Sequence, residues 1–188
     1  MDAGGSLRHS DRRMQTLLLF TDGSVDPARG LGVGVALGVP ESWLDRDPRS
    51  FDAGQIASRC AFRRFEATSS TQLEIDCAIW ALTEQAPAST DLVLLTDSQC
   101  VAGLLGRRAR LENTGFVSGR SGGELRHAER FREFFHLHDR RPFRIMKLAG
   151  HTDFRYQNAA HRIFHFVDRE ARRQLKRWLR ERPLTGEK

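Results

Sequence analysis

Leu17-Leu18-Leu19-Phe20-Thr21-Asp22-Gly23-Ser24 places a run of apolar side chains shortly before a carboxylate, a glycine and a hydroxyl group. An unbroken apolar run predicts a strand buried on both faces, because a half-exposed strand alternates apolar with polar residues. The same pattern returns at Leu92-Val93-Leu94-Leu95-Thr96-Asp97-Ser98. If the two strands are parallel neighbours, Asp22 and Asp97 meet at their carboxyl-terminal ends, where open α/β sheets place their functional sites.

The remaining hydrophobic pattern predicts the order β-β-β-α-β-α-α-β-α. We expect strands over residues 16–21, 32–39, 56–68, 92–96 and 143–148, and helices over residues 71–85, 98–112, 124–139 and 158–182. Residues 41–54 and 149–157 are expected to be loops, and the Gly/Ser-rich stretch 113–123 a mobile loop. Gly30, Gly32 and Gly34 precede or lie in a strand, so we interpret them as close-packing positions rather than a dinucleotide fingerprint.

The connections between the predicted strands indicate how the strands are arranged. The first three strands have short connections and predict an antiparallel meander. The fourth and fifth arrive through helical crossovers and therefore lie parallel to the first. The predicted fold class is α/β, with a five-stranded mixed sheet in the order 3-2-1-4-5, strand 2 antiparallel, flanked by helices.

Length and composition are those of one ordinary globular domain. The chain has 188 residues, 39% of them hydrophobic and 29% charged. We expect a polar, disordered tail over residues 1–15, one domain over 16–182 and a short tail over 183–188. An excess of 30 Lys and Arg over 24 Asp and Glu favours a polyanionic partner such as nucleic acid, although the same charge also keeps proteins soluble.

Several classes of protein are disfavoured by the same sequence. The 3 cysteines form no CxxC or Cys/His cluster, which argues against a disulfide framework or a zinc site. No apolar run approaches the ~18 residues of a membrane span. The first 15 residues lack the apolar segment of a secretory signal, so we expect a cytoplasmic protein.

Two further carboxylates lie on helix faces that are predicted to pack against the sheet. Glu74 shares a helical stripe with Ala78 and Leu82, but it also fits a capping box, Thr71-x-x-Glu74, and both interpretations stay open. Asp168 falls within the apolar row of the last helix. Such a carboxylate needs a partner, which is either a bound cation or a nearby arginine.

Four converging carboxylates would repel one another and raise one another's pKa unless cations bind between them. Carboxylate oxygens suit Mg²⁺ or Mn²⁺ rather than zinc. Two such ions, roughly 4 Å apart, can activate a water and stabilise the leaving oxygen of a phosphodiester. We therefore expect two Mg²⁺ or Mn²⁺ ions at a site formed by Asp22, Glu74, Asp97 and Asp168.

Five short motifs follow one another along the chain: Thr21-Asp22-Gly23-Ser24, Ser70-Thr71-Gln72-Leu73-Glu74, Leu95-Thr96-Asp97-Ser98-Gln99, Gly150-His151 and Val167-Asp168-Arg169-Glu170-Ala171-Arg172. In this order the chain resembles type 1 ribonuclease H from about Leu17 to Leu179. The resemblance implies the ribonuclease H-like fold and an endonuclease that hydrolyses the RNA strand of RNA/DNA hybrids, leaving 5′-phosphate and 3′-hydroxyl ends. It assigns Asp22, Glu74, Asp97 and Asp168 to catalysis and metal binding, and His151 to proton handling or product departure.

The resemblance also implies substrate contacts. Gly23, Ser24, Ser70 and Thr71 match positions that touch the minor groove, where the 2′-hydroxyl distinguishes RNA from DNA. The family usually has asparagine where Ser70 and Thr71 stand, and its spacing from the histidine to the last aspartate is shorter.

Phosphate contacts are less clear from the motifs. Residues 112–123 lack the basic, Trp-containing handle of many bacterial members, so the chain is similar to the handle-less bacterial type. Arg107 and Arg108, or the basic last helix, are the candidates for phosphate contacts, and a solvated helix face is the alternative. We expect a monomer whose partner is the RNA/DNA hybrid.

Three other classes of protein share parts of this pattern. A haloacid dehalogenase-type phosphatase needs an aspartate two residues before Asp22, and that residue is Phe20, which excludes the phosphoaspartate mechanism. A catalytically weak or inactive nucleic-acid-binding module of the same fold stays open. So does a resolvase-like DNA nuclease, although such chains normally carry additional segments.

Overall fold

The computed structural model describes residues 15–87, 91–149 and 158–182. The strands are β1 (Leu17–Asp26), β2 (Leu31–Pro40), β3 (Ala61–Phe65), β4 (Leu92–Thr96) and β5 (Arg144–Lys147). The helices are α1 (Ala53–Arg59), α2 (Ser70–Trp80), α3 (Gln99–Ala102), α4 (Leu104–Asn113), α5 (Ala128–Arg140) and α6 (Ala159–Glu181). Short turns of helix are η1 (Glu41–Asp45), η2 (Pro48–Ser50) and η3 (Ala81–Gln85).

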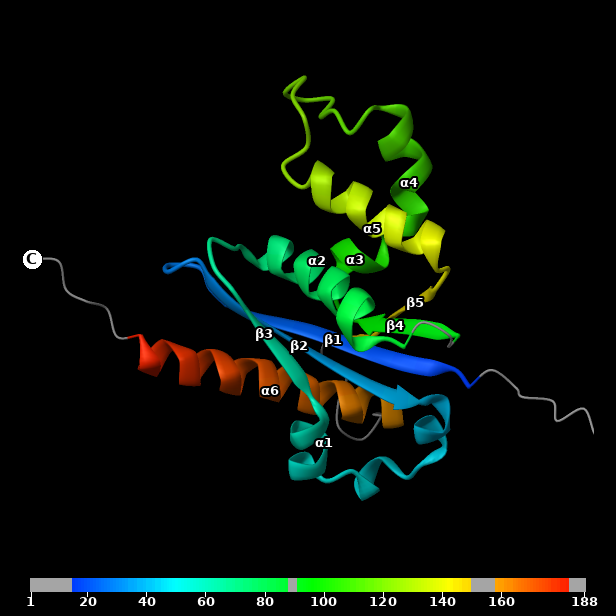
Figure 1. The fold of residues 1–188 in the computed structure, drawn as a ribbon, viewed down its shortest axis with the longest axis vertical. Coiled ribbons are helices and arrows are strands. Elements are labelled where there is room, and N and C mark those ends of the chain that lie inside the picture. The colour runs from blue at the N-terminus through cyan, green and yellow to red at the C-terminus, as the bar shows by residue number, and fades with distance from the viewer. Residues whose placement is uncertain (1–14, 88–90, 150–157, 183–188) are drawn as a thin grey trace, which may run out of the picture.

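The sheet has the strand order β3-β2-β1-β4-β5. β1 pairs antiparallel with β2, and β2 antiparallel with β3, whereas β4 pairs parallel with both β1 and β5. The α6 helix and α1 cover one face, and α2 to α5 cover the other (Figure 1). The predicted five-stranded mixed sheet, with its order and antiparallel strand 2, is confirmed.

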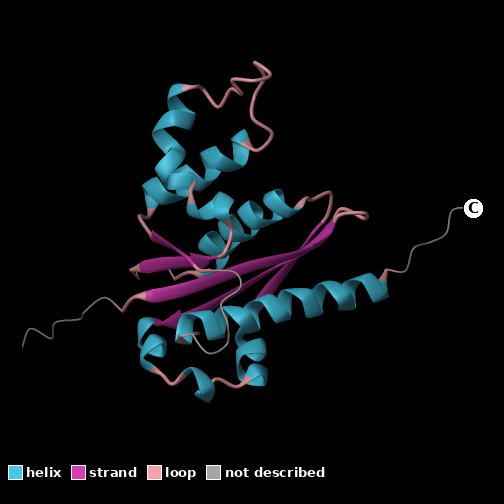
Figure 2. Cartoon of the chain, turned by 180° about the vertical axis from the view of Figure 1, so that it is seen from behind, coloured by secondary structure: helices cyan, strands magenta, loops and turns pink. Residues whose placement is uncertain are grey.

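Alternate residues of β1 enter two separate hydrophobic cores. Leu18 and Phe20 belong to the core beneath α6, and Leu19 belongs to the core beneath α2 and α5. All three side chains are at most 1% exposed, as predicted for a strand covered on both faces. Figure 2 shows this layering from behind, with the strands enclosed between helices.

β1 is longer than predicted, and this changes where Asp22 lies. The antiparallel ladder with β2 continues from Asp22↔Val35 to Asp26↔Leu31, while the parallel pairing with β4 ends at Phe20↔Leu95. Asp22 is therefore inside β1 rather than at its end. It still lies just beyond the last pair that β1 makes with β4.

The predicted third strand over residues 56–68 is wrong in its first part. Residues 53–59 form α1, whose N-cap Asp52 accepts a hydrogen bond from the Gln55 backbone N–H, and Ile56 is buried in the core beneath α6. The strand β3 then begins at Ala61. Residues 41–50 also form η1 and η2 where a loop was expected. Capping and burial of Ile56 thus favour a helix over the β-pattern of the local sequence.

Three predicted helices have different limits in the structure. The helix expected over residues 98–112 divides at Gly103 into α3 and α4, and the one expected over 71–85 passes into π-helical geometry at η3. α5 begins at Ala128 rather than at residue 124. The last helix is close to its predicted range, because Asn158 caps it by accepting from the His161 backbone N–H.

The helix α2 crosses β2 at two glycines. A Cβ atom on Gly34 would lie 2.7 Å from the Cys77 Sγ atom, and one on Gly32 would lie 2.8 Å from Leu73. The close-packing interpretation of these glycines is confirmed. The Cys77 thiol is buried in this contact and donates to the Asp22 carbonyl oxygen at 3.5 Å, which fixes α2 against β1 beside Asp22.

The ends of the chain fall largely outside the described ranges. Of the predicted tails over residues 1–15 and 183–188, the structure describes Gln15 alone. Within the described residues, no helix combines the length and apolar character that crossing a membrane requires.

Candidate active site

The register of the central strands brings Asp22 and Asp97 to corresponding positions. Leu17 pairs with Leu92 and Phe20 with Leu95, so each β1 residue faces the β4 residue 75 positions later. Asp22 and Asp97 have the same separation, two residues beyond the last pair. The prediction that the two apolar strands are parallel neighbours is confirmed, and their register leaves Asp22 and Asp97 at equivalent positions.

Asp22 lies in an environment that disfavours a negative charge. Burial, and to a smaller extent the charges of Asp97 and Asp168, raise the pKa of its carboxyl group to about 7, against opposing effects of the Gly23 backbone N–H and Arg172. Aspartates from β1, from the end of β4 and from α6 therefore influence one another electrostatically. At neutral pH about half of the Asp22 carboxyl groups carry a proton.

Glu74 is connected to the same region through a serine. Its Oε2 atom accepts a hydrogen bond of 2.5 Å from the Ser98 hydroxyl, and Ser98 directly follows Asp97. The Ser98 oxygen in turn accepts from the Val101 backbone N–H and caps α3. The capping-box interpretation with Thr71 is wrong, because α2 has Ser69 as its N-cap and Glu74 bonds to Ser98 instead.

Asp168 lies on the first half of α6 and is half-buried. Its Oδ1 atom is 2.8 Å from the Arg172 Nη2 atom, one helical turn further on. Pairing with a nearby arginine was one of the two partners that the sequence allowed for this aspartate. The pair leaves 24% of the Asp168 side chain exposed.

The carboxylate oxygens are chemically suited to a divalent ion, but the described side chains are not arranged as a metal site. Carboxylate oxygens are the ligands that Mg²⁺ and Mn²⁺ prefer. In the parts of the chain that the structure describes, however, no three His, Cys, Asp or Glu side chains form a group that could hold a metal ion. Arg172 contacts Asp168, and Ser98 contacts Glu74. Each of these contacts engages one oxygen of its carboxylate.

The residues predicted to read the minor groove come from two adjoining segments. Gly23 and Ser24 belong to β1, and Ser70 and Thr71 are exposed at the start of α2. The Leu73 side chain joins these segments, because a Cβ atom on Gly23 would lie 3.0 Å from it. The predicted histidine, His151, lies outside the described residues.

The two arginines predicted to contact phosphates already bond within the protein. Arg107 donates to the Gly103 and Cys100 carbonyl oxygens. Arg108 donates to both carboxylate oxygens of Asp139, at 2.5 and 2.8 Å, and to Glu112 at 2.7 Å. These contacts within the protein do not support the predicted phosphate contacts of Arg107 and Arg108; the alternative was a solvated helix face.

One carboxylate with a defined environment received no role from the sequence. Glu170 is 4% exposed, and it accepts hydrogen bonds from Arg173 and from Gln174. The i,i+3 and i,i+4 spacing of these residues is a signal for such contacts, although it does not reveal that the glutamate is buried.

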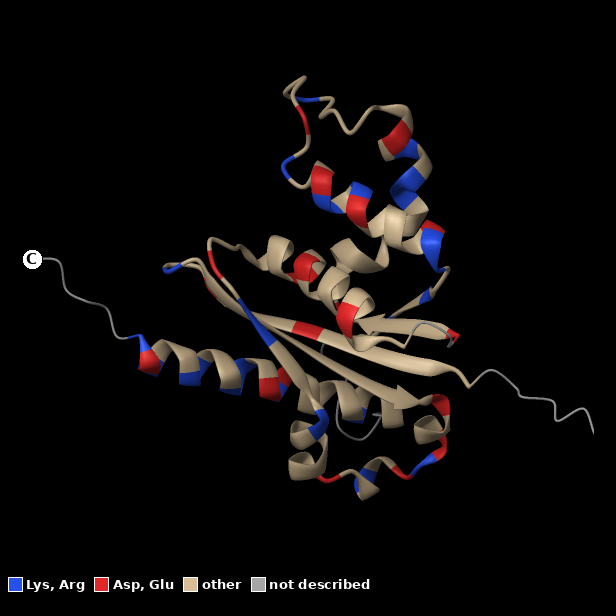
Figure 3. Ribbon diagram, viewed as in Figure 1, with Lys and Arg blue, Asp and Glu red and all other residues tan. Residues whose placement is uncertain are grey.

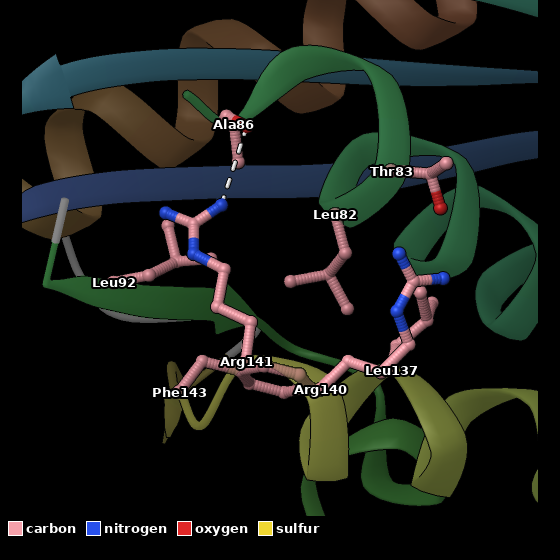
Figure 4. Close-up of a pocket in the computed structure, with 8 residues that line it drawn as sticks. All are labelled: Leu82, Thr83, Ala86, Leu92, Leu137, Arg140, Arg141 and Phe143. Carbon is pink, nitrogen blue, oxygen red and sulfur yellow. Dashed lines mark hydrogen bonds between the residues drawn. The ribbon is translucent and has the colours of Figure 1, made fainter. Parts of the chain in front are cut away.

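A separate hollow lies at the other end of the sheet. It has a volume of about 310 Å³ and lies between η3 and the end of α5. Arg141 donates to the Ala86 carbonyl oxygen at its edge, and Leu82 and Leu137 contribute apolar walls (Figure 4). It contacts Leu92, the first residue of β4, whereas Asp97 follows the last. This hollow is thus distinct from the carboxylate site.

Comparison with known proteins identifies the fold. No protein-family model and no curated protein matches the chain. Among solved structures, the solution structure of the PFV RNase H domain is 12% identical with a TM-score of 0.59, over 85% of this chain and 93% of that one.

Two foamy viral protease-reverse transcriptase structures also match. One, in complex with RNA/DNA hybrid, is 11% identical with a TM-score of 0.57 over 85% of this chain, which spans 20% of that polypeptide. The other, in complex with dsDNA, is 12% identical with a TM-score of 0.53, over 80% of this chain and 90% of that one. The mixed sheet and its flanking helices thus form a ribonuclease H-like fold.

Proposed function

We propose that this protein is a divalent-metal-dependent endoribonuclease that hydrolyses the RNA strand of RNA/DNA hybrids. The main support is the position of Asp22, which lies beside Asp97 in the register of β1 and β4 and within electrostatic reach of Asp168. These carboxylates lie where the sheet changes from antiparallel to parallel pairing, on a fold shared with RNase H domains.

In this proposal the four carboxylates hold two Mg²⁺ or Mn²⁺ ions. When bound, such ions supply the positive charge that stabilises an attacking water and a leaving oxygen of the phosphodiester. Asp22, which the charges of Asp97 and Asp168 both influence, would be a ligand of these ions. Burial disfavours the negative charge of Asp22 in the free protein. A cation that neutralises this charge would therefore be bound more strongly.

The other residues have supporting roles. Gly23 and Ser24, together with Ser70 and Thr71, are proposed to contact the 2′-hydroxyl side of the minor groove. The Ser98 hydroxyl orients Glu74 in the absence of an ion. His151 is proposed to assist proton handling or product release, as the sequence resemblance implies.

A nucleic-acid-binding module with weak or no catalysis is the second candidate. The ion pair between Arg172 and Asp168 favours it, because the arginine occupies a carboxylate that metal catalysis requires. The two candidates differ in one measurable property. Both bind nucleic acid, but only the endonuclease breaks a phosphodiester.

The test uses end-labelled RNA/DNA hybrid, duplex RNA and duplex DNA, each with Mg²⁺, Mn²⁺ or chelator. We expect metal-dependent cleavage of the RNA strand of the hybrid, lowered about 100-fold or more by Asp97→Asn. Asp91→Asn is the matched control, since Asp91 precedes β4 and pairs with Arg144. Binding without cleavage supports the second candidate, and cleavage of duplex DNA alone supports a resolvase-like nuclease.

A further inference from the structure

The part of α6 that follows Asp168 is strongly basic. Between positions 169 and 182 the chain has 7 basic and 2 acidic residues. In Figure 3, Lys and Arg recur along the length of α6. Arg169, Arg172, Arg173, Lys176 and Arg180 are all exposed. Arg172 and Arg173 follow Arg169 by three and four positions, and Lys176 and Arg180 continue the same spacing, so these residues form one face of the helix.

This basic face borders a groove between α6 and α1. The groove has a volume of about 510 Å³, and its α1 side consists of Ala53, Gly54 and Ala57. The α6 side carries four cations: Arg169, Arg172, Arg173 and Lys176. The small side chains of α1 leave the groove open opposite these cations. We call this feature the α1–α6 groove.

The groove continues along α6. A second hollow, of about 450 Å³, shares Arg173 and Lys176 with the first and extends past Arg180. From Arg169 to Arg180 the helix rises about 16 Å. That length matches roughly five phosphates of one strand of a duplex, at about 3.4 Å of axis per phosphate.

One wall of the groove is fixed by an ion pair whose glutamate is buried. Glu170 accepts from the Arg173 Nε and Nη2 atoms at 2.7 Å each, and from Gln174. Burial opposes the charge of Glu170, but these hydrogen bonds outweigh it and lower its pKa, so the pair stays ionised. The Arg173 side chain is nevertheless 66% exposed and presents its outer edge to the groove.

The remaining cations are available for a ligand. Among the described residues, neither Arg169 nor Lys176 has an ion-pair partner. Arg172 lines the groove and also pairs with Asp168, so this one arginine contacts both the groove and one of the four carboxylates.

We propose that the α1–α6 groove binds the phosphate backbone of the nucleic acid whose strand enters the carboxylate site. A guanidinium group can donate two parallel hydrogen bonds to two oxygens of one phosphate. A row of such groups along a helix therefore suits a regularly spaced polyanion. This inference rests on the proposed function, because it takes the strand bound in the groove to be the one that enters the carboxylate site. It adds a substrate surface that uses the helix inserted between β2 and β3.

The experiment measures binding without cleavage. Fluorescence anisotropy in chelator gives the Kd of a labelled RNA/DNA hybrid at several salt concentrations. We compare the wild type with Arg169→Gln/Lys176→Gln, which keeps both ion pairs of this region. The matched control is Arg120→Gln/Arg140→Gln, which removes the same charge from exposed residues outside the groove.

We expect the groove variant to bind about tenfold more weakly at 0.1 M salt, with the slope of log Kd against log salt reduced by about 2. The control should retain the wild-type slope. Equal slopes for the wild type and the groove variant would overturn the proposal, as would a wild type that binds no hybrid. An acidic protein that competes with the hybrid only in the wild type would instead identify a protein-binding groove.

Cleavage is measured separately with Mg²⁺, so that the two proposals can fail independently. If the groove variant loses binding while the wild type never cleaves, the proposed function fails and the groove stands. If the wild type cleaves and both variants bind equally, the groove proposal fails and the proposed function stands.

Discussion

Asp22 is the residue at which burial and like charge act together. Burial raises the pKa of its carboxyl group to about 7 from an ordinary value of 3.8, assisted by Asp97 and Asp168. Between about pH 4 and pH 7, the Asp22 carboxyl group therefore keeps its proton in the folded state but has lost it in the unfolded chain. By linkage, the free energy of unfolding falls as the pH rises through this interval.

For Asp22→Asn we expect this fall to disappear in metal-free buffer. The wild type should lose about 1.4 kcal/mol of stability for each pH unit between roughly pH 4 and pH 7, and the variant should be the more stable protein above pH 7. Urea denaturation at pH 4.5 and pH 7.5 measures the difference. Asp45→Asn, in the exposed turn η1, is the control, and a variant with the same pH dependence as the wild type would contradict the account.

Arg172 is the residue that supplies positive charge to the carboxylates in the free protein. It contacts Asp168 at 2.8 Å, and its charge opposes the rise of the Asp22 pKa. A divalent ion that binds Asp168 must compete with this arginine. The sequence allowed the ion pair through its i,i+4 spacing but did not distinguish it from a cation-bound carboxylate.

We therefore expect Arg172→Ala to bind Mn²⁺ several-fold more tightly than the wild type, measured by isothermal titration calorimetry. Removing the arginine frees Asp168 and removes a repelling charge. Arg169→Ala removes the same charge without an ion pair among the described residues, and should leave the Mn²⁺ affinity close to that of the wild type. Weaker binding by Arg172→Ala would show that the arginine does not compete with the ion.

At the scale of elements, the contact between α2 and β2 positions Glu74. The two backbones approach closely because Gly32 and Gly34 have no side chain. The buried Cys77 fills the space above Gly34 and donates to the carbonyl oxygens of Asp22 and Val35. The helix is thus held at one distance from the strand that carries Asp22.

Gly34→Ala should destabilise the fold by about 1–3 kcal/mol, because the new methyl group would lie 2.7 Å from the Cys77 Sγ atom and 3.0 Å from its Cβ. Displacing α2 should also lower any cleavage activity that depends on Glu74. Gly38→Ala is the control, since its Cβ would make an ordinary 3.5 Å contact with Leu17. Equal denaturation midpoints for the two variants would refute this packing argument.

Elements with one strong local signal were predictable. The apolar runs of β1 and β4 gave the central strands, and Asn158 marked the start of α6. The elements that were predicted wrongly depend on tertiary contacts. The α1 helix is stabilised by burial of Ile56 against the α6 layer. The break at Gly103 separates α3 from α4, although the sequence pattern over residues 98–112 predicts one continuous helix.

At the scale of the whole molecule, the carboxylate site depends on elements far apart in the chain. The sequence indicated which carboxylates to consider, because each comes directly after an apolar strand pattern or lies on a helix face toward the sheet. It did not predict their partners in the free protein. The Ser98 contact to Glu74 joins α2 to the start of α3 and arises only when these elements pack together.

Divalent ions should stabilise the whole fold if the four carboxylates bind them. We expect 10 mM MgCl2 to raise the Tm above its value in chelator at equal ionic strength, by mass action on the folded state. Asp97→Asn should lose this shift, and Asp91→Asn should retain it. An increase of the same size in all three proteins would indicate a general salt effect rather than a site.

The most direct measurement is the anomalous scattering of Mn²⁺ in crystals grown with the ion. We predict two manganese peaks near Asp22, with carboxylate oxygens of Asp97 and of Asp168 or Glu74 about 2.0–2.2 Å from a manganese ion. We also predict that Arg172 has moved away from Asp168. Crystals at saturating Mn²⁺ with no peak in contact with Asp22, and with the Arg172–Asp168 pair unchanged, would contradict it.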